Sequence, residues 1–414
     1  MYYDNKFDVV VIGGGASGMM AACVASALGK KVVILEKNAE LGEKLKISGG
    51  GRCNITNNER DVRTFLENYG KAKDFLFSAF SQFGVEDTFK FFESRKLPLV
   101  VQARDRVFPQ TENAFDVFKT LENELKNNQV LIKTHSKVLK INHENGEIKS
   151  VETTQGNFTG ISFILATGGV SHPETGSTGD GFGWLRDLGH SVKDPTPTIV
   201  PIAASNQWIK VLAGVSLTFM KITFFLDGKK QFSKTGKILF THFGLSSPLI
   251  LNSAAEVGEL LMNGEVTATI DAFPDTDLGS LDTKIVNTFD ANKNRSLKNV
   301  LKEIVPHGTT KGIELLLSDI NLETPVHSIT KDERKKIVNL LKALPVEITG
   351  LMGNDRAVSA DGGVILEEIN MRTMKSNFFG NLFVTGDLLH INRPSGGYSL
   401  QLCWTTGAIA GRNA

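Results

Sequence analysis

Hydrophobic positions in the first fifty residues follow a strand, turn, helix, strand order. Residues 7–12 form a short valine-rich run, which is typical of a buried parallel strand. A glycine-rich turn follows, and residues 19–28 are small and apolar, with Gly29 as a helix stop. Residues 31–35 form a second apolar run, which Glu36 closes. The pattern predicts a βαβ unit.

The turn of this unit, Gly13–Gly18, matches G-x-G-x-x-G. Gly13 would permit the tight turn, Gly15 would let a pyrophosphate approach the backbone, and Gly18 would let helix and strand pack closely. Glu36 lies 18 residues beyond Gly18, near the spacing expected of a ribose-binding acid. The motif predicts dinucleotide binding at the helix N-terminus. The alternative is a turn that binds nothing.

The same region, residues 9–29, contains no charge and could suggest a membrane span or signal peptide. Its glycines cluster where a turn is needed, and no basic segment precedes it. We therefore expect a soluble nucleotide-binding fold without a membrane partner.

The pattern of expected helices and strands changes twice along the chain, and these two changes predict the domain boundaries. Amphipathic helices are expected over 61–96, 114–126 and 182–188, and strands over 130–141, 147–154 and 158–165, with a hairpin turn at Asn145-Gly146. Prolines at 195, 197 and 201 mark the first change, and Pro345 marks the second. The prediction is an α/β fold with a first domain piece at 1–197 and a second at 345–414. Between them lies an insert, β-rich over 198–273 and helical over 274–344, with one helix expected over 246–262.

Residues 44–57 form the most distinctive segment, KLKISGGGRCNITN. Three consecutive glycines predict a loop whose backbone can approach a ligand, flanked by Lys44, Arg52 and Asn54. The alternative is a surface glycine loop. Cys53 has no partner cysteine nearby in sequence, so we expect a packed or flavin-adjacent structural thiol rather than a redox group.

A strand followed by glycine and an acid recurs at 381–387, near the other end of the chain. Asp387 would accept hydrogen bonds from sugar-like hydroxyls of a long ligand. The helix that begins near Gly396 would direct its N–H groups at a group gaining negative charge, as a reduced flavin does. NAD does not need this second site, whereas FAD does. The alternative is a strand–helix unit that only closes the sheet.

Composition narrows the function classes. The net charge is +1 over 414 residues, which gives no global attraction to nucleic acid or anionic membranes. Three dispersed cysteines suggest a reducing cytoplasm, and the histidine spacing predicts no metal site. No second G-x-G-x-x-G follows any later strand, so no dedicated nicotinamide nucleotide domain is predicted.

The motifs GGGASG, ISGGGRCNITN, ATGG, FTHFGLSSP, GDLL and PSGGYSLQ together resemble the BaiN-like/aminoacetone-oxidase-like family of FAD-dependent oxidoreductases over essentially the whole chain. The resemblance implies a glutathione-reductase-like FAD domain in two sequence pieces, with an insert made of a β-barrel part and a helical part. It also implies that FAD is lined by Gly13, Gly15, Gly18, Glu36, Lys37, Gly51, Arg52, Asn54, Val138, Thr167, Gly168, Asp387, Gly397 and Tyr398. From the same motifs we assign Ala16, Ser17, Lys44, Cys53, Ala166, Gly386, Gly396 and Ser399 to the cofactor site.

One segment departs from the family pattern. Many members resemble GE-x-L-D where this chain has Gly386-Asp387-Leu388-Leu389-His390, and His390 and Arg393 replace an acid and a small residue near the expected flavin. Members have been linked to amine oxidation, to reduction of conjugated enones in steroid-like acids, and to reduction of a uridine in ribosomal RNA. The substrate therefore stays open, as do the catalytic residue and the oligomeric state.

Three functions are weighed. The first is hydride transfer between FAD and a small organic substrate, with NAD(P)H as a candidate transient donor. The second is reduction of a uridine in ribosomal RNA, for which Lys229, Lys230, Lys234 and Lys237 form a basic hairpin region; a solvated lysine-rich hairpin is the favoured interpretation. The third is a non-catalytic FAD-binding protein, which would not require so large an insert.

Overall fold

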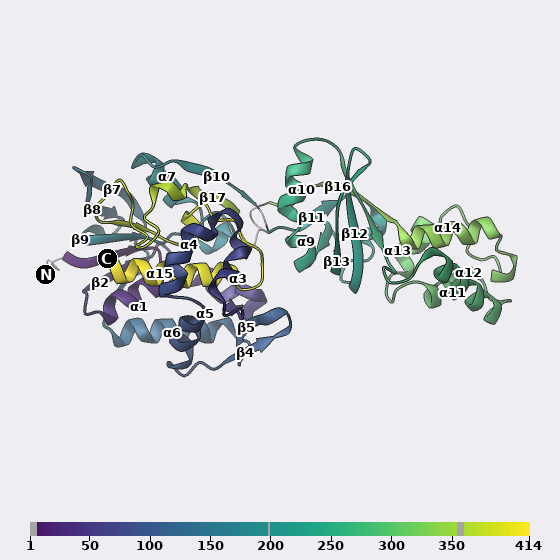
Figure 1. Ribbon diagram of the computed structural model, residues 1–414, viewed down its shortest axis with the longest axis horizontal. Helices are drawn as coiled ribbons and strands as arrows, with labels where there is room; N and C mark the ends of the chain where they lie inside the picture. The colour runs from purple at the N-terminus through teal and green to yellow at the C-terminus, as the bar shows by residue number, and fades with distance from the viewer. Residues whose placement is uncertain (1–5, 198, 354–359) are drawn as a thin grey trace. The chain divides into compact units, whose positions relative to one another are not determined.

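A computed structural model describes residues 6–197, 199–353 and 360–414, and these fall into two compact units (Figure 1). The first unit lies within Met1–Pro197 and Val358–Ala414, and the second within Thr198–Ala357. The first unit is thus built from two separate pieces of the sequence.

The first unit is organised around a seven-stranded sheet of order β6-β2-β1-β9-β8-β7, with β18 also paired to β9. Strands β6, β2, β1, β9 and β18 run parallel, whereas β7 and β8 add an antiparallel hairpin. Every position of β2 is buried, as expected of a strand in the middle of a covered parallel sheet. The strands are β1 (Lys6–Ile12), β2 (Val32–Leu35), β6 (Leu131–Lys133), β7 (Val138–Glu144), β8 (Glu147–Thr153), β9 (Gly156–Leu165) and β18 (Leu382–Val384).

Two small sheets complete this unit. One has the order β3-β5-β4 and joins β3 (Thr56–Asn57), β5 (Arg106–Pro109) and β4 (Leu99–Gln102). The other pairs β10 (Val192–Pro197) antiparallel with β17 (Ala360–Val364). The β10–β17 pair joins the end of the first sequence piece to the start of the second.

The helices of the first unit are α1 (Ala16–Ala27), α2 (Glu43–Ile47), α3 (Val62–Leu66), α4 (Lys73–Gln82), α5 (Val85–Glu93), α6 (Ala114–Asn127), α7 (Asp180–Asp187) and α15 (Tyr398–Asn413). The last helix, α15, lies along α1 (Figure 1). The contact is close because glycine occupies two positions of α15 that face the α1 backbone, Gly407 and Gly411. A Cβ on Gly407 would lie 2.4 Å from the Ser17 carbonyl oxygen, and one on Gly411 would lie 2.2 Å from that of Ala21. These glycines let the C-terminal piece pack on the nucleotide-motif helix.

We expect Gly407→Ala to destabilise the protein even though alanine favours helices. The added methyl group would overlap the α1 backbone, and overpacking of this kind costs roughly 1–3 kcal/mol. The matched control is Gly183→Ala in α7, where a Cβ meets no atom within 4 Å and the change should be neutral or slightly stabilising. Thermal or urea unfolding of the two variants checks the prediction. Equal stability of both would contradict close α1–α15 packing.

The second unit contains a closed antiparallel barrel of order β11-β14-β13-β12-β15-β16. Its strands are β11 (Ile202–Ala204), β12 (Ser216–Leu226), β13 (Lys229–Thr241), β14 (Gly244–Ser246), β15 (Val266–Asp271) and β16 (Leu344–Leu351). The helices of this unit are α8 (Gln207–Lys210), α9 (Pro248–Leu251), α10 (Ala254–Leu261), α11 (Leu278–Ala291), α12 (Leu297–Ile304), α13 (Thr310–Leu316) and α14 (Lys331–Lys342). One apolar core runs through the barrel and these helices.

The predicted fold class is confirmed: an α/β domain in two sequence pieces with an inserted barrel and a helical part. The domain boundary predicted at residue 345 is too early. β16 begins at Leu344, and Pro345 pairs with Thr269 inside the barrel. Proline is tolerated at the start of a strand, so Pro345 does not end the insert. The second unit therefore includes β16, which ends at Leu351.

Two predicted elements are divided. The strand expected over 130–141 is β6 and β7, separated by a turn at 134–137, and the helix expected over 246–262 is α9 and α10. The Asn145-Gly146 hairpin is confirmed, with both residues at positive φ, 53° and 72°. Among the described residues, no helix combines the length and apolar character that a membrane crossing requires.

Candidate functional site

In the turn between β1 and α1, the surroundings differ at each of the three motif glycines. Gly13 adopts a φ of +102°, and a Cβ there would lie 2.6 Å from the Ala166 carbonyl oxygen. At Gly18 a Cβ would lie 2.0 Å from the Gly13 carbonyl oxygen. At Gly15 no protein atom lies within 4 Å of the Cβ position. Gly13 and Gly18 are therefore required by packing, whereas Gly15 leaves open space for a ligand.

Helix α1 begins at this turn without a side-chain cap on Gly15 and without an acid in its first turn. Unbonded N–H groups at a helix start favour an anion. Ala16 and Ser17 form the first turn, and Ser17 is buried. The helix start therefore suits a phosphate group.

Glu36 closes the same region from the end of β2. It is 8% exposed, and its two carboxylate oxygens accept hydrogen bonds from the N–H groups of Gly14 at 2.8 Å and Asn38 at 2.9 Å. Each carboxylate oxygen can accept a further bond, so ribose hydroxyls can still be held.

A narrow cleft of about 40 Å³ lies next to Glu36. Thr167 Oγ1 and Ser136 Oγ are buried and have no hydrogen-bond partner among the described residues, so the cleft contains polar atoms that a ligand could satisfy. Lys37 crosses the cleft edge and pairs with Asp180 at 2.8 Å. The lining residues are Ile12, Gly13, Leu35, Glu36, Lys37, Ser136, Lys137, Val138, Thr167, Gly176, Thr178, Asp180 and Trp184.

Some of these lining residues were not predicted. Ser136 and Lys137 lie in the turn that follows β6, which was predicted as part of one continuous strand. The available signal was that ligands bind at the carboxyl ends of parallel strands. Ala166 is buried beside Gly13, and Gly168 adopts φ +73° with its Cβ position 3.8 Å from Lys44 Nζ.

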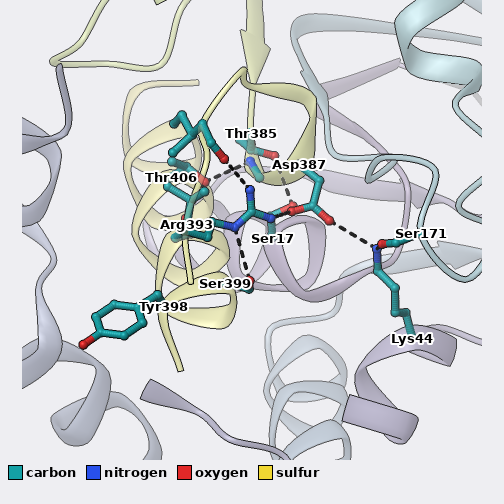
Figure 2. Close-up of polar contacts among 12 residues, drawn as sticks. Ser17, Lys44, Ser171, Thr385, Asp387, Arg393, Tyr398, Ser399 and Thr406 are labelled. Carbon is teal, nitrogen blue, oxygen red and sulfur yellow. Dashed lines mark hydrogen bonds and ion pairs between the residues drawn. The ribbon is translucent and has the colours of Figure 1, made fainter. Parts of the chain in front are cut away.

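The second centre of the site is Asp387, just after β18 (Figure 2). Lys44 Nζ lies 3.2 Å from Asp387 Oδ2 and also donates to Ser171 Oγ at 3.2 Å. Arg393 pairs with the other carboxylate oxygen. Burial raises the pKa of Asp387, but Arg393 and Lys44 outweigh burial and hold the pKa at about 2. Asp387 is therefore a carboxylate at any physiological pH.

Arg393 links Asp387 to the segment that leads into α15 through several hydrogen bonds. Only 4% of the residue is exposed, and its guanidinium donates to Ser399 Oγ at 3.2 Å and to the Ile391 carbonyl at 2.7 Å as well as to Asp387. It therefore ties Asp387 to the first turn of α15. His390, the other departure from the family pattern, lies 3.2 Å from Asp361.

The two glycine elements meet through hydroxyl groups. Ser17 Oγ on α1 lies 3.2 Å from Thr385 Oγ1, and Thr385 also donates to the Leu165 carbonyl at 3.1 Å (Figure 2). The Gly386 N–H donates to Thr406 Oγ1 at 3.0 Å. These bonds fix Gly386 and Asp387 beside the helix start of the first nucleotide motif, although more than 360 residues separate Ser17 from Thr385.

The triple-glycine loop lies against the start of α15. Gly49, Gly50 and Gly51 all adopt positive φ, and the Gly51 Cβ position faces open space, as predicted for a ligand-approaching loop. With its amide oriented to satisfy its partners, Asn54 accepts from the Gly397 N–H at 2.9 Å. Gly397 has φ +103°, and a Cβ there would lie 2.3 Å from the Thr56 carbonyl carbon. The segment that follows the loop therefore packs against the start of α15 at Gly397.

Tyr398 packs against aromatic side chains of the core. The Tyr398 ring centroid lies 5.0 Å from that of Phe65 and 6.1 Å from that of Tyr69. Figure 2 shows the ring directed away from Asp387 and Lys44. Arg52, by contrast, is partly exposed beside the loop, with its guanidinium carbon 4.6 Å from the Phe108 ring centroid.

Cys53 differs from its neighbours because no part of it is exposed. Burial raises the pKa of its thiol to about 12. A ligand at the loop surface cannot reach this thiol, which packs behind the loop as expected of a structural cysteine.

We therefore expect Cys53→Ser to retain a reducible flavin, with only a modest change in rate. The native thiol should also resist alkylation by iodoacetamide at pH 8 until the protein unfolds, because neither thiolate nor access is available. Mass spectrometry of labelled peptides and anaerobic reduction of the variant check this. A variant that cannot be reduced would make Cys53 a redox participant.

Comparisons with known proteins agree with this geometry. The family model described as "HI0933-like protein Rossmann domain" matches residues 7–413. The chain is 29% identical to a 3-dehydro-bile acid delta(4,6)-reductase of Clostridium scindens over 98% of each chain. It is 26% identical to a ribosomal RNA dihydrouridine synthase of Escherichia coli, over 97% of this chain and 96% of that one.

Among solved structures, a flavocytochrome c3 fumarate reductase in an open conformation matches with TM-score 0.55 at 17% identity, over 100% of this chain and 78% of that chain. A 3-ketosteroid-delta4-(5alpha)-dehydrogenase of Rhodococcus jostii matches with TM-score 0.53 at 13% identity, over 100% of this chain and 97% of that chain. At these identities the likeness shows the fold.

Proposed function

The chain belongs to the HI0933-like family of Rossmann-domain, FAD-dependent oxidoreductases, and on that premise we propose that it reduces a carbon–carbon double bond conjugated to a carbonyl group. Two relatives that match nearly its whole length support this substrate class. Their names describe reduction of a 3-dehydro-bile acid and formation of dihydrouridine, and in both the reduced bond is conjugated to a carbonyl.

One observation supports the cofactor assignment most: the hydroxyl groups of Ser17 and Thr385 lie 3.2 Å apart, which brings the two glycine elements together. A mononucleotide would fill only one of them. The start of α1 suits the pyrophosphate, Glu36 suits the adenosine ribose, and the cleft with Thr167 and Ser136 suits the adenine side. Bound FAD supplies hydride-transfer chemistry at this site.

The residues near the other end of the site would hold the flavin half. Asp387 is fixed as a carboxylate by Lys44 and Arg393 and can accept hydrogen bonds from ribityl hydroxyls. The start of α15 at Gly397 offers backbone N–H groups and the positive end of a helix dipole. The open position at Gly51 lets the loop backbone approach the ring.

NAD(P)H is the electron donor that we propose, binding transiently and without a domain of its own. A second G-x-G-x-x-G does not follow any later strand of the sequence. A donor that binds only while it reduces the flavin would not need a nucleotide-binding domain of its own.

Reduction of a uridine in ribosomal RNA is the second candidate, because a curated relative with that name matches 97% of this chain. The lysines proposed for RNA contact lie on β13. Lys234 is already paired with Glu256 and donates to the Asn252 carbonyl, which reduces the free positive charge of the hairpin. A small-molecule substrate is therefore favoured.

The test begins with purified holoprotein reduced under anaerobic conditions by NADH and, separately, by NADPH. The reduced enzyme is then mixed with a conjugated enone, with its saturated analogue as control, and with a uridine-containing ribosomal RNA fragment. We expect reoxidation by the enone and none by the saturated analogue. Reoxidation by the RNA fragment alone would favour the second candidate, and reoxidation by neither would reject both.

A further inference from the structure

Three arginines gather beside the triple-glycine loop: Arg52, Arg104 and Arg106. The Arg52 guanidinium carbon lies 4.6 Å from the Phe108 ring centroid, and that of Arg106 lies 5.8 Å from it. Two cations therefore share one aromatic ring. Burial lowers the pKa of Arg106, and the nearby charges of Arg52 and Arg104 lower it further. The protein holds these like charges together against their repulsion.

The backbone that presents them is constrained. Arg104 and Asp105 both adopt left-handed conformations, with φ of 64° and 54°, in the turn between β4 and β5. Asn57 Nδ2 donates to the Arg104 carbonyl at 3.2 Å, and the Asn58 N–H donates to the Asp105 carbonyl at 2.6 Å. Consecutive non-glycine residues in this region cost energy and cluster at functional sites.

Nearby acids only partly compensate the positive charge. Glu112 lies 3.7 Å from Arg52, which is too long for a hydrogen bond, and both side chains are well exposed. The same carboxylate accepts from Gln102. Arg106 uses its Nε to donate to the Ala103 carbonyl at 3.1 Å. By contrast, Arg393 has a carboxylate in close contact.

The cluster adjoins the two elements assigned to the flavin ring. A Cβ on Gly49 would lie 3.7 Å from Phe108 Cε1, so the loop passes close to the ring over which Arg52 and Arg106 lie. β5, which carries Arg106, pairs with β3, and the main chain of Thr56 in β3 touches Gly397. An anion bound by the arginines would therefore lie beside both the loop and the start of α15.

We propose that Arg52, Arg104 and Arg106 form an anion-binding subsite that holds a carboxylate of the substrate. An oxyanion would relieve the repulsion among the guanidinium groups and could accept bidentate hydrogen bonds from them. This inference rests on the proposed function and narrows its substrate to an anionic enone, such as a 3-oxo-4-ene steroid acid. The named relatives support it, since a bile acid and RNA are both anions.

The experiment compares 3-oxo-4-cholenoic acid with its methyl ester on the holoenzyme, and adds inorganic sulfate as a probe that needs no turnover. The variants are Arg104→Gln and Arg106→Gln. The control is Arg63→Gln. Arg63 is an exposed arginine on α3, and its guanidinium lies near the Phe77 ring of α4. Sulfate binding is read from the melting temperature and from protection of Arg104 and Arg106 against phenylglyoxal. The acid and ester are compared by KM and by kcat.

We expect sulfate to protect both arginines and to compete with the acid but not with the ester. Each cluster variant should raise KM for the acid roughly 10- to 100-fold, as loss of a charge-assisted hydrogen bond does, and leave the ester within about twofold. Arg63→Gln should match the wild type in sulfate binding and in the KM and kcat for both the acid and the ester. Because Arg104 is exposed, its variant remains informative if Arg106→Gln folds poorly.

Equal KM values for acid and ester, or loss of both in the cluster variants, would overturn the subsite while leaving the proposed reaction intact. Turnover of neither compound, with sulfate protection retained, would instead reject the enone reaction and leave an anion site. Absence of sulfate protection in the wild type would also reject the subsite.

Discussion

Gly15→Val is expected to abolish stoichiometric FAD binding while leaving the apoprotein folded. Gly15 has φ −79° and ψ −170°, an extended conformation that valine adopts readily, and no protein atom lies within 4 Å of its Cβ position. The added side chain would occupy only the space in which the pyrophosphate meets the start of α1. Flavin absorbance after purification and titration of the apoprotein with FAD measure the loss.

The neighbouring glycine provides the control. Gly18→Ala inserts a Cβ 2.0 Å from the Gly13 carbonyl oxygen, so it should lower the melting temperature of the apoprotein, which Gly15→Val should not. Retention of full FAD by folded Gly15→Val would mean that the cofactor does not pass over this turn.

Asp387→Ala is expected to have the second large effect, on both cofactor and fold. Losing a charge-assisted acceptor should weaken FAD binding by roughly one to two decades. It also leaves Arg393, whose side chain is 2% exposed, without its carboxylate, and breaking a buried pair in this way costs about 3–5 kcal/mol. Isothermal FAD titration and urea unfolding of the apoprotein measure the two effects separately.

Asp387→Asn separates charge from shape, because it keeps one acceptor oxygen but removes the charge. We expect an intermediate loss of FAD affinity. In the wild type, the depressed pKa of Asp387 means that its ion pairs stabilise the fold above pH 4 and that this contribution is lost as the pH falls toward 2. If the alanine variant changes neither affinity nor stability, Asp387 does not touch the cofactor.

Local chemistry made the first half of the site predictable. The G-x-G-x-x-G spacing identified Gly13 and Gly18, where a Cβ would overlap the backbone, and Gly15, where the Cβ position is open. The Asn145-Gly146 pair identified the hairpin between β7 and β8. The amphipathic helices expected over 61–96 bury Phe65 and Tyr69 in the core. Each of these signals lies within a few residues of the feature that it predicts.

Long-range convergence was not predictable from one sequence. Lys44 reaches Asp387 from a segment 343 residues away, and nothing in the sequence near Lys44 indicates this pairing. Arg393, by contrast, is only 6 residues from Asp387. The domain boundary predicted at Pro345 could have been corrected from the sequence. Leu344, Val346 and Ile348 alternate with exposed residues, which is the pattern of a barrel strand that continues past Pro345. The packing at Gly397 is also long-range, because a Cβ there would lie 2.3 Å from the Thr56 carbonyl carbon, so glycine is required at that position.

Titration of the apoprotein with FAD and with FMN tests the central claim most directly, because the site is proposed to span both glycine elements. FAD should bind stoichiometrically and at least 100-fold more tightly than FMN, since the ADP half contributes the pyrophosphate and ribose contacts at Gly15 and Glu36. Equal affinity for FMN and FAD, or no binding of either flavin by folded protein, would contradict the account.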